Sequence, residues 1–135
     1  MAGLTIDTLQ ELVRVAVKKA QEDFKRPMCL AIYDQYGFLL SFIRMEGVPV
    51  RSINIAHGKA YTAARMGVNS ADFLERLYRE NIPASYFCDD KLTGLPGGIV
   101  LKDKNGTVVG GVGISGLASS EDEEIGNALA AIVAS

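Results

Sequence analysis

The sequence predicts an α+β protein in which helices pack on a single antiparallel sheet, in the order α-ββ-α-α-ββ-α. Two pairs of short apolar runs are each joined by a glycine-containing turn, which is typical of β-hairpins. Segments with helical spacing of apolar residues stand before, between and after these pairs. Hairpins pair their strands antiparallel, so the two hairpins are expected to share one sheet that the helices cover. The length of 135 residues, 48% of them hydrophobic, predicts one domain over residues 1–135.

The first helix and the first hairpin have clear boundaries in the sequence. Apolar residues recur at helical spacing over residues 5–24, with Thr5 as the expected N-cap and Pro27 ending the helix. Two short apolar runs follow, and they predict strands over residues 28–33 and 38–44.

Two helices are expected in the middle of the chain. Ser52 is the expected N-cap of the first, and Gly67 is a suitable residue to end it. Asn69 or Ser70 is expected to cap a shorter helix that ends at about Glu80.

The last third of the chain begins with the longest irregular stretch, residues 81–98. A loop of this length in a compact protein is usually functional or mobile. The second hairpin is expected to have strands over 99–102 and 107–115, joined by an Asp-Lys-Asn-Gly turn. A capping box at Ser120–Glu123 is predicted to open the final helix.

Composition and charge exclude several classes of protein. The net charge is −2 and the basic residues are scattered, so we expect no nucleic-acid partner. No run approaches 18 apolar residues, so no membrane span is expected. Cys29 and Cys88 show no metal-binding or redox spacing. The first residues lack the pattern of a secretory signal, so a cytoplasmic protein is expected.

A glycine-rich stretch, Gly111 to Gly116, matches the GxGxxG fingerprint of dinucleotide-binding proteins. That fingerprint requires a βαβ unit, whereas the strand here belongs to a hairpin. Ser115 lies between Gly113 and Gly116, but Leu117 stands where a GxSxG nucleophile elbow needs glycine. We therefore expect these glycines to allow the close approach of another backbone or a flat ligand.

Four acidic residues, Glu121 to Glu124, lie at the predicted start of the last helix. They are expected to complement the helix dipole on a solvated face rather than to bind a metal. A structural zinc ion needs about four ligands, and the chain has a single histidine, so no structural metal is expected.

That histidine, His57, lies among small residues on the second predicted helix. It is a possible axial ligand of haem iron, because haem needs only one or two protein ligands and an apolar slot. The sequence also leaves open a catalytic base, or an incidental residue on a closely packed helix.

Four blocks of the sequence, in order, resemble the GlcG/HbpS-like family, which includes the C-terminal domain of PduO-type corrinoid adenosyltransferases. They are residues 30–47, 56–67, 95–116 and 122–131. The resemblance implies an α+β fold, symmetric homo-oligomers and binding of haem or a corrinoid-like tetrapyrrole. It also implies a link to glycolate, propanediol or glycerol metabolism.

The resemblance also implies which residues contact the ligand. These are Arg44, Lys59, Thr62, Pro96, Gly97, Gly98 and Ser115. His57 is not part of the family motif and is retained as a possible axial haem ligand. Arg44 or Lys59 can pair with a carboxylate of the ligand. Arg44 can instead pair with Glu46 or with the acidic last helix.

Three hypotheses remain open at this point. The first is a cytoplasmic, oligomeric binding or accessory protein for a tetrapyrrole or another small anionic ligand. The second is an enzyme that acts on a small carboxylic or carbonyl substrate, with Lys59 or His57 as the base. The third is a structural or assembly subunit, in which the glycine-rich strand and the alanine-rich helix serve packing between subunits.

Overall fold

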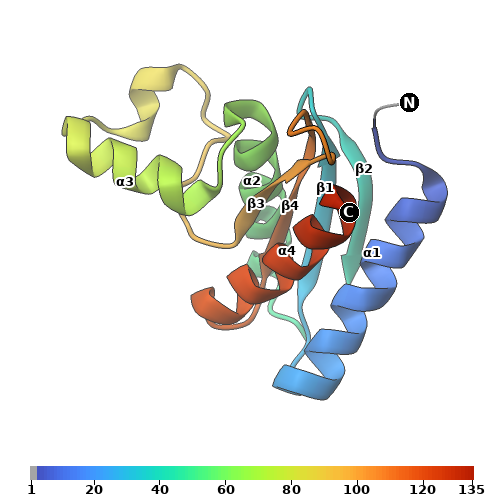
Figure 1. The fold of residues 1–135 in the computed structure, drawn as a ribbon. Helices are drawn as coiled ribbons and strands as arrows, with labels where there is room; N and C mark the ends of the chain where they lie inside the picture. Colours follow the sequence, from blue (N-terminus) through green and yellow to red (C-terminus); the bar gives the residue numbers. More distant parts are fainter. Residues whose placement is uncertain (1–2) are drawn as a thin grey trace.

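A computed structural model describes residues 3–135 and contains one four-stranded antiparallel sheet with helices on both faces (Figure 1). The strands are β1 (Cys29–Asp34), β2 (Leu39–Arg44), β3 (Gly98–Lys102) and β4 (Val108–Ser115). The helices are α1 (Ile6–Lys19, continued by a π-helical turn over Ala20–Phe24), α2 (Arg51–Met66), α3 (Ser70–Glu80) and α4 (Ser119–Ala134), with a 3₁₀ turn over Ala84–Phe87. The predicted α+β class and the order α-ββ-α-α-ββ-α are confirmed.

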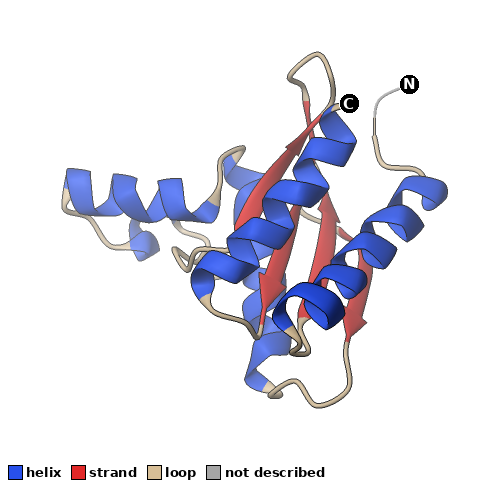
Figure 2. Cartoon of the chain, turned by 60° about the horizontal axis from the view of Figure 1, so that its bottom comes forward, coloured by secondary structure: helices blue, strands red, loops and turns tan. Residues whose placement is uncertain are grey.

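The strand order in the sheet is β2-β1-β4-β3, so the first strand of one hairpin pairs with the second strand of the other. Helices α1 and α4 lie side by side on one face of this sheet, and α2 lies on the other (Figure 2). Helix α3 extends away from the sheet (Figure 1). The main core fills the space between the sheet and the pair α1 and α4, and Leu12, Ile114 and Leu129 are fully buried there.

Helix α2 lies unusually close to β4. A Cβ atom added at Gly113 would be 2.1 Å from the carbonyl oxygen of Ala56 on that helix. Ala56, Ala60 and Ala63 are fully buried at the same contact. Small residues on both elements therefore bring the two backbones together, as expected for glycines within a strand.

Two predicted helix starts are wrong. Helix α2 begins at Arg51 with Val50 at the N-cap, and Ser52 is a buried residue of the first turn. The Ser52 amide donates to the carbonyl of Pro49, so the chain has already turned before Ser52. Helix α4 begins at Ser119 with Ala118 at the N-cap.

The predicted capping box of α4 is consequently shifted by two residues. The Ala118 amide donates to the Glu121 carboxylate at 3.1 Å, whereas the box was expected between Ser120 and Glu123. The box therefore joins the N-cap residue Ala118 to Glu121, three residues later, because the helix starts two residues earlier than predicted.

The cap of α3 is a polar link to the sheet. Asn69 occupies the N-cap position, but its side-chain oxygen accepts from the Val100 amide of β3 at 2.9 Å. The Ser70 hydroxyl accepts from the Gly98 amide at 2.9 Å and donates to the Leu95 carbonyl at 2.6 Å. These two residues therefore fix the end of the long loop against α3.

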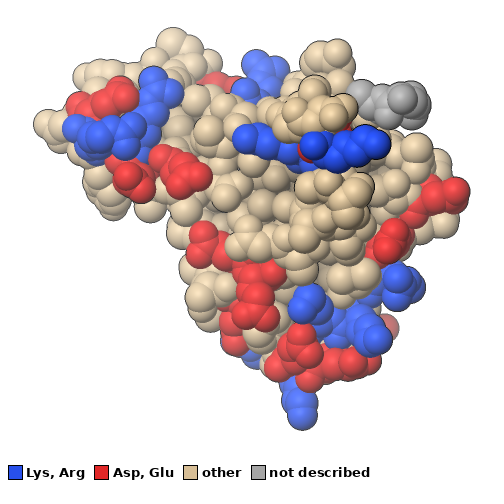
Figure 3. Space-filling model, viewed as in Figure 1, with Lys and Arg blue, Asp and Glu red and all other residues tan. Residues whose placement is uncertain are grey.

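Charged side chains of both signs lie together on the face shown in Figure 3, over α3 and at the end of α1. Of the helices within residues 3–135, none has both the length and the apolar character that a membrane crossing needs.

Candidate functional site

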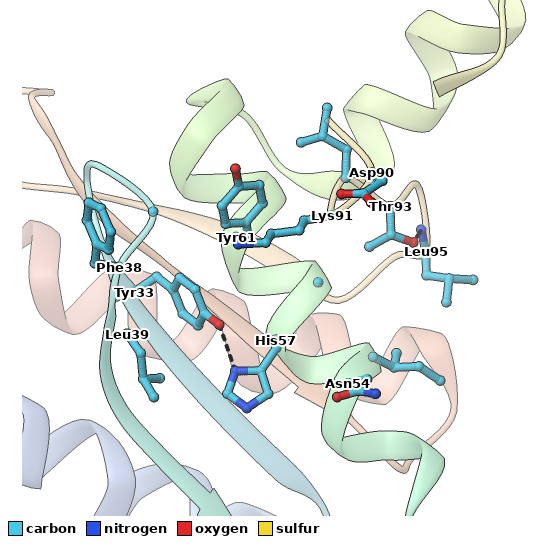
Figure 4. Close-up of a pocket in the computed structure, with 14 residues that line it drawn as sticks. Tyr33, Phe38, Leu39, Asn54, His57, Tyr61, Asp90, Lys91, Thr93 and Leu95 are labelled. Atoms are coloured by element: carbon cyan, nitrogen blue, oxygen red, sulfur yellow. Dashed lines mark hydrogen bonds between the residues drawn. The ribbon is translucent and has the colours of Figure 1, made fainter. Parts of the chain in front are cut away.

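A pocket of about 620 Å³ lies between α2, the β1–β2 turn and the last part of the long loop (Figure 4). The apolar residues Phe38 and Leu39 lie on one side, and Thr93 and Leu95 lie on the opposite side. His57 lies between these two sides. The volume is in the range of pockets that hold small organic ligands, and the lining combines apolar surface with a few polar groups.

The ring of His57 is held on two sides. Its Nδ1 atom is 2.7 Å from the hydroxyl oxygen of Tyr33, which is the contact drawn in Figure 4. The ring stacks on Phe42, with centroids 4.5 Å apart and an angle of 14° between the planes. Burial lowers the pKa of His57 below its ordinary value, because a charged imidazole is poorly solvated there. The ring is therefore a neutral, oriented imidazole at neutral pH.

The loop wall of the pocket is tied to α2. The Thr62 hydroxyl donates to the Gly58 carbonyl at 2.8 Å and accepts from the Thr93 amide at 2.9 Å. The Tyr61 hydroxyl donates to Asp89 at 2.6 Å. Thr62, one of the predicted ligand contacts, is thus fully buried and holds the loop beside the pocket.

Lys59, another predicted contact, forms a buried ion pair. Its Nζ atom donates to Asp122 Oδ2 at 3.1 Å and to the Ile114 carbonyl at 2.7 Å. Both side chains are almost fully buried, so the expectation that the acidic cluster lies on a solvated face is wrong for Asp122. This pair could not be predicted from the sequence, because its partners are 63 positions apart and meet only after the sheet has formed.

The predicted glycine turn packs against the same pair. Gly97 has a φ angle of +119°, and a Cβ atom there would lie 2.8 Å from Lys59 Nζ. A Cβ atom at Gly98 would lie 2.4 Å from the carbonyl oxygen of Lys59. Pro96, the residue before them, is partly buried. The structure therefore brings Lys59, Gly97 and Gly98 together.

Arg44 and Ser115 lie in one row of the sheet. Both pair with Cys29, Arg44 from β2 and Ser115 from β4. Arg44 is exposed at the end of its strand and does not line the pocket beside His57. It also does not line a smaller pocket, of about 220 Å³, which Lys59 lines between the starts of α2 and α4. Ser115 is only 4% exposed and, like Lys59, lines that smaller pocket.

Several lining residues of the large pocket were not among the sequence-based candidates. These are Tyr33, Phe38, Leu39, Asn54, Tyr61, Lys91 and Leu95. One signal in the sequence pointed to them: residues 81–98 form the longest irregular stretch, and Lys91 and Leu95 belong to it. Phe38 and Leu39 follow a hairpin turn, where two consecutive apolar residues are 70% and 52% exposed.

No three His, Cys, Asp or Glu side chains within residues 3–135 gather closely enough to hold a metal ion.

Comparison with known proteins gives one family and several similar structures. The sequence profile described as "Haem degrading protein HbpS-like" matches residues 4–131. A search of curated proteins found no significant match.

Among solved structures, a complex of PduOC with haem is 27% identical, with a TM-score of 0.85 over 96% of this chain and 94% of that one. A double mutant of HbpS from Streptomyces reticuli is 26% identical, with a TM-score of 0.86 over 100% and 90% of the two chains. The protein ORFY of Klebsiella pneumoniae is 19% identical and shares the fold, with a TM-score of 0.86 over 97% of this chain and 90% of that one.

Proposed function

The chain belongs to the HbpS-like family of haem-degrading proteins, and from this premise we propose that it binds haem in the pocket beside His57. The observation that carries the proposal is the state of His57, a neutral imidazole held by Tyr33 and stacked on Phe42 at the wall of a large, partly apolar pocket. The haem complex of the similar PduOC structure supports the same ligand class.

The pocket residues fit the chemistry of haem. Phe38, Leu39 and Leu95 supply apolar surface for the flat macrocycle. Lys91 lies at the rim, with its Nζ atom 5.4 Å from the centre of the Tyr61 ring, and its cation is suited to a propionate group. When bound, haem supplies an iron centre for ligand binding or redox chemistry, and the protein tunes it through the axial ligand and its surroundings.

His57 is suited to hold the iron. In the tautomer with the proton on Nδ1, the ring donates to the Tyr33 oxygen and keeps the lone pair of Nε2 free. A metal-binding histidine typically donates its second ring nitrogen in this way. Because burial lowers the pKa of His57, the ring stays neutral at pH values where an ordinary histidine begins to be protonated.

Titration with haemin tests the proposal. We expect a saturable shift of the Soret band near one equivalent per subunit. Changing His57→Ala should remove the spectrum of an imidazole complex and weaken binding. Tyr78→Ala, at a side chain that is 76% exposed on α3 and does not line the pocket, is the matched control and should bind normally. A wild-type titration that shows no saturable binding would contradict the haem proposal.

A corrinoid is the second ligand to try, because it shares a flat tetrapyrrole-like ring and the resemblance extends to the PduO family. A link to propanediol, glycolate or glycerol metabolism rests on that resemblance as well. Parallel titrations with haemin and with a cobalamin separate the two ligands, because each has its own visible spectrum.

A homo-oligomer is also part of the proposal. Strand β2 is an outer strand of the described sheet, and its residues Leu39 and Leu40 are 52% and 39% exposed. An outer strand with exposed apolar residues is suited to contact with another subunit. Light scattering on the purified protein would give the subunit number.

An enzymatic role is favoured by one observation, the hydrogen bond between Tyr33 and His57. In the other tautomer Tyr33 donates to His57, and the pair can move a proton to or from a substrate. Lys59 is less suited as the base, because Asp122 and a carbonyl hold its ammonium group. Haemin binding that His57→Ala leaves unchanged would favour this second role for His57.

A further inference from the structure

A second pocket, of about 220 Å³, lies between the starts of α2 and α4. Its polar lining consists of Arg51, Ser52, Lys59, Ser115, Ser119 and Asp122. Ile55 and Leu95 line both this pocket and the larger one, so the two pockets are neighbours separated by apolar side chains.

Two hydroxyl groups in this pocket have no hydrogen-bond partner among residues 3–135. Ser52 and Ser115 are each only 4% exposed, and neither side chain makes a hydrogen bond within residues 3–135. Every fully enclosed side-chain oxygen or nitrogen in these residues has a hydrogen-bond partner, so these two unpaired hydroxyls are not fully enclosed. Both residues line the open space of the pocket. A buried hydroxyl that faces open space is free to bind a ligand or water.

The pocket contains two cationic side chains, of which Lys59 is held by hydrogen bonds and Arg51 is exposed. The Lys59 ammonium group uses two of its three hydrogens for Asp122 and the Ile114 carbonyl, and the third remains available. Arg51 is exposed at the mouth. The lining carries two cations and one carboxylate, so its charge favours an anion.

The helices add to this preference. Arg51 and Ser52 begin α2, and Ser119 begins α4, and each of these helices has 16 residues. The positive ends of two helix dipoles therefore meet at the pocket, and helix starts favour negatively charged groups.

We propose that this pocket binds a small oxyanion, a phosphate or a short carboxylate, held by Arg51, Lys59 and the hydroxyls of Ser52 and Ser115. The site is independent of haem and of the larger pocket, although a propionate of a ligand in that pocket has the same chemistry. A volume of about 220 Å³ restricts the occupant to a group of a few heavy atoms.

Calorimetric titration of the untagged, haem-free protein tests the proposal, with inorganic phosphate and with acetate in chloride buffer at constant ionic strength. We expect saturable binding of at least one of these anions. Ser115→Ala should weaken it about tenfold, because it removes a hydrogen bond to a charged group. Arg51→Gln should weaken it by a similar factor. Both positions leave the Lys59–Asp122 pair intact, so the fold is retained.

Arg79→Gln is the matched control, because Arg79 is an exposed cation on α3 outside the pocket, and it should bind like the wild type. No saturable binding of either anion would overturn the proposal, and so would equal affinity in Ser115→Ala, Arg51→Gln and the wild type. Repeating the titration with haemin-loaded protein distinguishes a free anion from a haem propionate as the occupant of the pocket. Retained binding supports a free anion, whereas lost binding would assign the pocket to a haem propionate and overturn an independent site.

Discussion

The contact between Tyr33 and His57 determines how the only imidazole of the chain can act. The hydroxyl holds the orientation of the ring, and in the tautomer with the proton on Nδ1 it leaves the lone pair of Nε2 free to bind iron. Burial raises the pKa of Tyr33, so the hydroxyl stays protonated at neutral pH. Without this contact the ring would keep its stacking on Phe42 but lose its hydrogen bond at Nδ1.

Changing Tyr33→Phe should therefore weaken haemin binding about tenfold or more, since loss of such an outer partner typically costs a metal site 10–100-fold. The fold should stay intact, because the phenyl ring is retained. Haemin titration with a circular dichroism check measures both effects. Unchanged affinity would show that the hydroxyl has no part in holding His57 for the iron.

The protonation of Asp122 should make the stability of the protein depend on pH. Burial raises the pKa of Asp122 to about 6 from 3.8, although Lys59 and the Leu117 amide act in the opposite direction. Between these two values the folded protein binds a proton that the unfolded chain has released. The contribution of Asp122 to the free energy of unfolding must then fall as pH rises through this window.

The difference in unfolding free energy between wild type and Asp122→Asn isolates this effect. We expect the unfolding free energy of the wild type, minus that of the variant, to decrease by up to about 1.4 kcal/mol per pH unit between pH 4 and 6. It should level off above pH 7. Urea denaturation at several pH values measures it. A difference that is flat, or that favours the wild type as pH rises, would contradict the raised pKa.

At the scale of elements, the packing of α2 on β4 depends on the absence of side chains. Gly113→Ala would place a methyl group 2.1 Å from the Ala56 carbonyl, where backbone atoms on both sides leave no room. We expect a loss of more than about 2 kcal/mol in unfolding free energy, at the upper range of overpacked cores.

Gly58→Ala is the matched control on the facing helix. A Cβ atom there meets the Thr93 side chain at 3.4 Å, an ordinary contact, and alanine is the better helix former. Its stability should equal or exceed that of the wild type by up to about 1 kcal/mol. Equal losses in both variants, measured by urea denaturation, would show that the close approach of α2 is not what requires glycine.

The strands and helices were predictable because their signals are local. Periodicity and turn residues gave all four strands to within one residue at each end. Helix starts were less predictable, because a serine such as Ser52 can cap a helix or lie inside its first turn. The choice depends on how Pro49 and Val50 direct the chain, which no local pattern specifies.

The candidate site was predictable only in part, since it depends on long-range pairing. The strand order β2-β1-β4-β3 brings α4 beside β3 and β4, and only then does Asp122 meet Lys59. The pocket beside His57 likewise needs the β1–β2 turn and the long loop to meet over α2. His57 could be named as a candidate from the sequence, but its partners Tyr33 and Phe42 could not.

At the scale of the whole molecule, α2 connects the two proposed sites. His57 lines the larger pocket, and Lys59, two residues later, lines the smaller one. The helix is fixed against the sheet by glycine-to-alanine contacts and at its centre by the ion pair with α4. This closely packed helix thus positions an imidazole and a cation in neighbouring pockets.

Ligation of haem iron by His57 is the central claim, and isotope labelling tests it most directly. His57 is the only histidine, so untagged protein grown with ¹⁵N-histidine carries the label in one ring. Electron–nuclear double resonance of the ferric haem complex should show strong coupling of ¹⁵N to the iron. A complex that forms saturably but shows no histidine coupling would contradict the claim.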